Sequence, residues 1–166
     1  MKLRHHEALE CYDRSIQLNP HDSDAYLNKG EILIELSRYE EALQILKAAI
    51  NISPNNSEAY YRKGNCYLKL KKYEEAIKCF EKAIEFNPSL SEAFCDRGLC
   101  FKFLGRYEDA LKNYDIAIDL DRRNAEAYYN KANILCILNR FDDSIRYFDK
   151  AIEFSPTYAD AFYNKG

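Results

Sequence analysis

The sequence predicts an all-α solenoid in which pairs of antiparallel helices stack along the chain. Prolines and glycines recur with a fixed period of about 34 residues, a spacing typical of repeat architectures. The apolar residues between them have helical spacing. In such architectures stacked neighbours bury the apolar faces that one repeat cannot bury alone. Only four prolines and five glycines occur among 166 residues, which disfavours a turn-rich all-β protein.

The positions of the prolines and glycines define the repeat. Pro20, Pro54 and Pro88 are evenly spaced, and Pro156 lies two periods after Pro88. Four of the glycines follow the same period, and an alanine takes the remaining place: Gly30, Gly64, Gly98, Ala132 and Gly166. The prolines and most of the glycines therefore fall at two equivalent positions of the period. We call such a set of equivalent positions a column. Two such columns indicate one structural unit repeated along the chain.

Each period predicts two short amphipathic helices joined by a tight turn. In the repeat 57–90, one apolar stripe runs from Tyr60 to Leu68 and a second runs from Tyr73 to Ile84, both with helical spacing. Pro88 ends the second helix because proline biases the preceding residue out of the helical region. One second-helix column is isoleucine throughout and is expected in the core: Ile16, Ile50, Ile84, Ile118 and Ile152.

The start of the second helix carries capping signals. Ser37-x-x-Glu40 predicts a capping box, and Asn139-x-x-Asp142 imitates it.

The period divides the chain into four full repeats, 23–56, 57–90, 91–124 and 125–158. Residues 1–22 supply a second helix alone, and residues 159–166 begin a further first helix. Both ends cut through a repeat, so we expect a fragment of a longer array whose open ends allow self-association.

Residues 57–90 read Tyr60-x2-Lys63-Gly64-x2-Tyr67, then Ala76-x3-Phe80, then Pro88. This pattern resembles the tetratricopeptide repeat (TPR) family, and the resemblance extends over the whole chain. It implies a right-handed solenoid whose first helices line a concave groove for a peptide or partner protein. Basic residues stand where leucine is commoner in the family: Lys29, Lys63, Arg97, Lys131 and Lys165. Their methylenes are expected on the neighbouring helix and their charges in water.

The groove residues implied by the resemblance are those of the first helices that belong to neither core nor turn. An asparagine amide can both donate to and accept from an extended peptide backbone, and tyrosine is enriched at binding hot spots. The predicted partner-binding set is Asn28, Glu31, Tyr61, Arg62, Asn65, Lys69, Asp96, Phe103, Tyr129, Asn130, Asn133, Tyr163 and Asn164. The asparagines resemble the ladder in the TPR domain of O-linked N-acetylglucosamine transferase. The equal alternative is that these asparagines and tyrosines lie on a solvent-exposed helix face without a binding role.

The charges on this face indicate which ligands to expect. Acids outnumber bases, which favours a basic or extended ligand, although many of the acids lie in first helical turns, where the helix dipole alone favours them. The resemblance implies that a carboxylate clamp for a chaperone tail needs bases where this chain has Glu58, Tyr61, Glu92, Glu126 and Tyr129. Such a tail is therefore not expected as a partner.

The leading hypothesis is a non-enzymatic protein–protein interaction scaffold. The alternative is the substrate-recognition arm of a larger enzyme, such as a glycosyltransferase, whose catalytic domain lies outside this chain. No nucleophile-elbow, zincin, P-loop or dinucleotide-binding motif occurs. The adjacent His5 and His6 point to different sides of a helix and cannot chelate a metal together. No cofactor is expected.

The composition sets further bounds. A net charge of −3 and an acidic groove disfavour a nucleic-acid partner. No stretch of about 20 apolar residues could span a membrane, and no secretory h-region occurs at the start, so a cytoplasmic location is expected. Six cysteines without a CxxC pair indicate reduced thiols. Those in apolar columns read as small core residues: Cys11, Cys66, Cys79 and Cys100.

Overall fold

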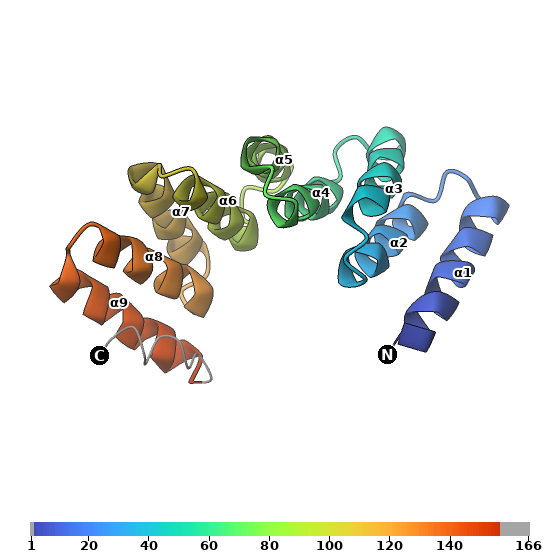
Figure 1. Ribbon diagram of the computed structural model, residues 1–166. Helices are drawn as coiled ribbons and strands as arrows, with labels where there is room; N and C mark the ends of the chain where they lie inside the picture. Colours follow the sequence, from blue (N-terminus) through green and yellow to red (C-terminus); the bar gives the residue numbers. More distant parts are fainter. Residues whose placement is uncertain (1, 157–166) are drawn as a thin grey trace. The chain divides into compact units, whose positions relative to one another are not determined.

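The computed structural model describes residues 2–156, and every regular element in that range is an α-helix (Figure 1). The helices are α1 (Lys2–Leu18), α2 (Ser23–Glu35), α3 (Tyr39–Ile52), α4 (Ser57–Lys69), α5 (Tyr73–Phe86), α6 (Ser91–Phe103), α7 (Tyr107–Leu120), α8 (Ala125–Ile137) and α9 (Phe141–Phe154). The expected start of a further first helix at 159–166, with Tyr163 and Asn164, lies outside the described residues.

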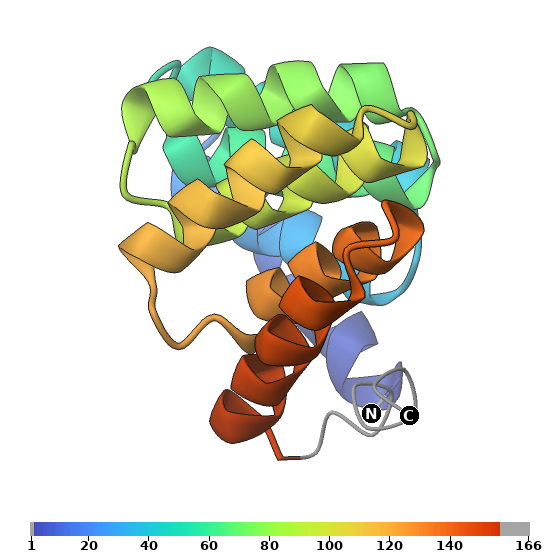
Figure 2. The same cartoon turned by 90° about the vertical axis from the view of Figure 1, so that its left-hand side faces the viewer.

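The chain forms two compact halves, residues 1–88 and 89–166. In the N-terminal half each of α1 to α4 packs against the helix that follows it, and α2 also reaches α4. In the C-terminal half each of α6 to α8 packs against the helix that follows it, and α6 also reaches α8. Figure 2 shows α9 lying along α8. Within each half, the predicted stacking of helix pairs is confirmed, and the first helices are neighbours.

The turn inside each helix pair contains one residue in the left-handed region. These residues form a further column with the period of the repeat: Ser37 (φ 58°), Lys71 (φ 58°), Gly105 (φ 72°) and Asn139 (φ 58°). The N–H of the next residue then returns to a carbonyl in the last turn of the first helix, as Arg38 N–H does to Leu33 O at 2.8 Å. This closure satisfies carbonyls that the helix end would otherwise leave unpaired.

The predicted capping boxes at Ser37 and Asn139 are wrong. Both residues are the left-handed turn residues, and the caps of α3 and α9 are Arg38 and Arg140, neither of which makes a side-chain capping bond.

Side-chain caps occur at the first helices instead. Asp22, Asn56 and Asn124 accept hydrogen bonds from backbone N–H groups three residues later, at 3.0–3.1 Å. Each such cap stabilises its helix by about 1 kcal/mol. Leu90 takes the corresponding place before α6 and makes no side-chain cap, so α6 starts without this contribution.

The deepest packing in each pair is between the glycine column and a large residue on the second helix. A Cβ added to Gly64 would lie 2.5 Å from Cε1 of Phe80, a distance at which the ring would have to move. The residues facing this column are fully buried: Leu46, Phe80, Tyr114 and Phe148. The isoleucine column that was expected in the core is only half-buried, so it lines the edge of this packing.

Two expectations about side chains are corrected. Lys131 is 8% exposed, and its ammonium donates to Asp115 and to the Tyr147 hydroxyl, the latter at 2.7 Å, so its charge is paired rather than hydrated. Cys11 is exposed and does not belong to the core, whereas Cys66 is buried as expected.

Within residues 2–156, no helix combines the length and apolar character needed to cross a bilayer.

Candidate functional site

We define the first-helix face of each half as the side chains of its first helices that are not fully buried in the core. In the N-terminal half these come from α2 and α4, and in the C-terminal half from α6 and α8. The two faces contain all the predicted partner-binding residues that the structure describes except Asn130, which is buried.

Arg62 lies at the centre of the N-terminal first-helix face. Its Nη1 is 2.7 Å from Oε2 of Glu31 in α2, and its Nε is 2.8 Å from Oε1 of Glu58 in α4. The structure therefore brings the predicted residues Glu31 and Arg62 together, with Glu58 as a third member. The single guanidinium partly offsets the two acids and links α2 to α4.

The other predicted residues of this half surround the Arg62 ion pairs. Asn28 on α2 and Asn65 on α4 are half-buried, and Lys69 is exposed in the last turn of α4. Tyr61 is half-buried, with its ring centroid 5.9 Å from that of Phe80. The aromatic side chain thus rests on the core residue Phe80 and is only partly exposed.

The C-terminal first-helix face contains a hollow of about 480 Å³ between α6 and α8. Its lining consists of Lys102, Tyr129, Asn133, Cys136 and Ile137. Tyr129 and Asn133 belong to the predicted set, whereas Lys102, Cys136 and Ile137 do not. Large apolar side chains are exposed at this end of the face, because Phe103 keeps 55% and Ile137 keeps 49% of its surface accessible.

Asn130 lies deeper than a groove residue was expected to lie. It is 6% exposed, and its side chain hydrogen-bonds the buried thiol of Cys95. The fully buried hydroxyl of Tyr114 has no hydrogen-bond partner among the described residues. Burial, reinforced by the neighbouring Cys95, raises the pKa of the Tyr114 hydroxyl. Asn130 therefore contributes to the layer beneath the face, and a ligand would meet Asn133 and Tyr129 more readily.

Lys102 differs from the other cations of the C-terminal half that are at least partly buried. The Arg97 side chain donates to Asn113 at 2.8 Å, and Lys131 is paired as described above. Lys102 is half-buried and makes no hydrogen bond or ion pair with the described residues. Burial alone lowers the pKa of its ammonium, because removal from water disfavours the charged form.

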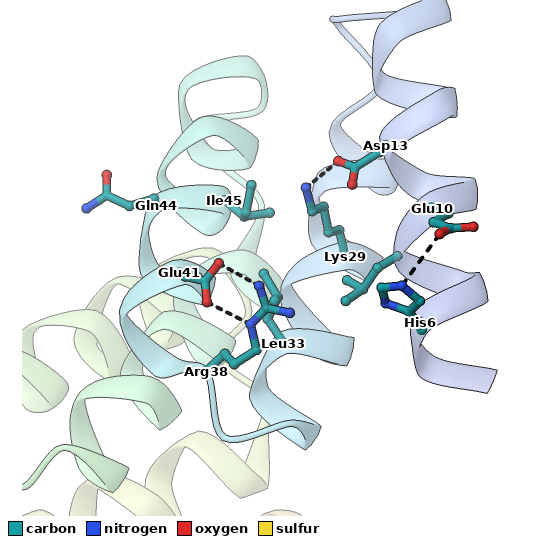
Figure 3. A pocket seen from close by; sticks show the side chains of 10 residues that line it. His6, Glu10, Asp13, Lys29, Leu33, Arg38, Glu41, Gln44 and Ile45 are labelled. Carbon is teal, nitrogen blue, oxygen red and sulfur yellow. Dashed lines mark hydrogen bonds and ion pairs between the residues drawn. The ribbon is translucent and has the colours of Figure 1, made fainter. Parts of the chain in front are cut away.

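A second hollow, of about 360 Å³, lies in the N-terminal half between α1, α2 and α3 (Figure 3). Its charged groups are already paired: Arg38 donates to both carboxylate oxygens of Glu41 at 2.7 Å, and Lys29 donates to Asp13. A similar hollow recurs one period later, lined by Glu40, Leu43, Gln44, Lys47, Lys63, Tyr67 and Lys72. The recurrence indicates that the hollow is a product of helix-pair stacking within this half, so it does not mark a dedicated site.

Sequence models of one family match along the chain. Three models described as "Tetratricopeptide repeat" match residues 11–44, 57–90 and 95–159, and one described as "TPR repeat" matches residues 30–71. The comparison with curated proteins returns no match.

Solved structures share the fold. A crystal structure of MamA superposes with a TM-score of 0.81 at 22% identity, covering 92% of this chain and 89% of that one. MamA from Desulfovibrio magneticus gives 0.83 at 22% identity, with coverages of 93% and 88%. A thermophilic TPR protein of Thermus thermophilus gives 0.79 at 22% identity, with coverages of 98% and 89%. These likenesses confirm the predicted all-α solenoid.

Proposed function

The chain belongs to the tetratricopeptide repeat family, a family of protein-interaction scaffolds, and we propose that it holds an extended segment of a partner protein on its first-helix faces. The proposal assigns no catalytic step to the chain, since repeats of this family are typically non-catalytic.

The observation that supports this proposal best is the exposed apolar surface on the first helices of the C-terminal half. Phe103 and Ile137 are both about half exposed, and Ile137 borders the hollow between α6 and α8. Exposed apolar groups beside a hollow with a few polar groups are typical of binding surfaces. Burial of one such side chain by a ligand would contribute about 1 kcal/mol or more.

Polar groups next to this surface would fix the ligand's backbone. The amide of Asn133 and the hydroxyl of Tyr129 both line the hollow, and such groups can donate to or accept from main-chain atoms without reading the sequence. Acidic residues lie toward the other end of the same helices, with Glu92 in the first turn of α6 and Glu126 in the first turn of α8. We therefore propose that basic residues of the ligand lie at that end.

The test compares an isoleucine on a first helix with an isoleucine on a second helix. Peptides that bind the full chain are selected from a displayed library, and their Kd values are measured for the Ile137→Ser and Ile116→Ser variants. Ile116 is 39% exposed on the second helix α7, which makes it a matched control. We expect Ile137→Ser to weaken binding about tenfold, as loss of about 1.4 kcal/mol would, and Ile116→Ser to leave the Kd unchanged. The opposite pattern would place the ligand on the second helices and refute the proposal.

A further inference from the structure

Lys102 breaks a column of the repeat. The equivalent positions in the two preceding repeats and in the following one hold Ile34, Leu68 and Cys136, and all three are half-buried like Lys102 itself. The site therefore suits an apolar side chain in the other repeats. A lysine there reduces apolar packing and places an ammonium where water is partly excluded, so packing gives no reason for its presence.

The surroundings of the Lys102 ammonium provide no compensation within the described part of the chain. No carboxylate pairs with it, and burial is the sole cause of its lowered pKa. Lys131, by contrast, lies even deeper and is held by a carboxylate and a hydroxyl. A half-buried cation that lines a hollow without a counter-charge favours an anion in that hollow.

We propose that the hollow between α6 and α8 binds the carboxylate of a glutamate or aspartate side chain of the partner segment, with Lys102 as its counter-ion. The Asn133 amide and the Tyr129 hydroxyl, which line the same hollow, can donate further hydrogen bonds to the carboxylate oxygens. An apolar residue next to the acid in the ligand would cover Ile137. The inference rests on the proposed function, because it names the chemistry of the segment that the first-helix face binds.

The experiment measures the preference for a carboxylate over a neutral isostere. The probes are short fluorescent peptides with amidated C-termini, each carrying a central Glu-Phe, Gln-Phe or Lys-Phe pair, so that a side chain supplies the central carboxylate. Their Kd values for the full chain are measured by fluorescence anisotropy. We expect the Glu-Phe peptide to bind about tenfold more tightly than the Gln-Phe peptide, because one charge-assisted contact distinguishes them.

Three variants make the assignment specific. Lys102→Leu introduces leucine, the residue type found at the equivalent position Leu68. This variant is therefore expected to be at least as stable as the unsubstituted chain, which thermal unfolding checks. It should reduce the Glu-to-Gln preference to about one. Lys102→Glu should transfer the preference to the Lys-Phe peptide. Lys112→Leu, which removes an exposed lysine of α7, is the matched control and should keep the tenfold preference.

The outcomes separate this inference from the proposed function. If the Glu-Phe and Gln-Phe peptides bind equally well, and Ile137→Ser still weakens both, the inference is overturned and the proposed function stands. Persistence of the Glu-Phe preference in Lys102→Leu would also overturn it, because the carboxylate would then be recognised elsewhere. Failure of every peptide to bind the full chain would refute both the inference and the proposed function.

Discussion

The hydroxyl of Tyr114 offers a direct test of how the repeat is packed. Tyr114 is fully buried on α7 and rests against Gly98, where an added Cβ would lie 2.8 Å from its ring. Phe80 and Phe148 fill the same column with rings that lack a hydroxyl. Because the Tyr114 hydroxyl has no hydrogen-bond partner within the described residues, replacing Tyr114 by Phe deletes a buried polar group and keeps the ring.

The size of the effect follows from the cost of burying an unpaired hydroxyl, which is about 1–3 kcal/mol in proteins. We therefore expect Tyr114→Phe to increase the free energy of unfolding of the C-terminal half by about that amount. For a half of this size, thermal unfolding should show a rise of roughly 4–8 °C in Tm for each kcal/mol. Native-state hydrogen exchange of the α7 amides checks that the gain belongs to this half.

A matched control gives the opposite sign. The Tyr147 hydroxyl accepts a hydrogen bond from the Lys131 ammonium at 2.7 Å, so Tyr147→Phe makes the same chemical change but removes a charge-assisted bond. It should lower stability by about 1 kcal/mol or more. A loss of stability on Tyr114→Phe, or the same response in both variants, would show that the Tyr114 hydroxyl has a partner and would refute the reasoning.

Three further predictions concern the turn, the packing column and the thiols. Lys71 is left-handed at φ 58°, so Lys71→Gly should raise stability by up to about 1 kcal/mol in urea unfolding, and an unchanged or lower midpoint would contradict this. Gly64→Ala places a Cβ against the Phe80 ring and should cost about 1–3 kcal/mol in the same assay; a neutral effect would mean that the ring yields freely. Burial raises the pKa of the Cys66 thiol to about 12, whereas Cys11 is exposed. A thiol reagent at pH 8 should therefore label Cys11 first and Cys66 only on unfolding, and equal labelling rates would contradict the burial.

The helix pairs could be predicted because their constraints are local and repeat in the sequence. Glycine or alanine recurs at Gly64 and its equivalents because the large side chain opposite leaves little room there, so spacing alone reveals the pairing. The turn was predicted less well. Gly105 is the one glycine outside the main column, and it shares a period with Ser37. That coincidence was the available signal that Ser37 is a left-handed turn residue rather than a cap.

The candidate site could be predicted only as a face. Periodicity indicates which positions leave the core, but it does not show which side chains reach one another. The ion pairs of Arg62 with Glu31 and Glu58 join two helices, and the buried Asn130 hydrogen-bonds the Cys95 thiol of α6. Such contacts depend on side-chain length and on the distance between neighbouring helices, neither of which the spacing of residues records.

Departures from the columns distinguish one repeat from the next, because residues that recur at every period serve the stacking common to all of them. Three departures bury or partly bury a charged or polar group at a cost: Arg62 in the Asn28 column, the hydroxyl of Tyr114 and the ammonium of Lys102. The carboxylates beside Arg62 offset its charge, and the Tyr114 hydroxyl is sealed from any ligand. Lys102 alone of these three is both uncompensated within the described residues and accessible from a hollow. No group of the described fold offsets the cost of the Lys102 ammonium, and a ligand in the hollow can reach it. These two facts are the physical reason to look for ligand specificity at this position.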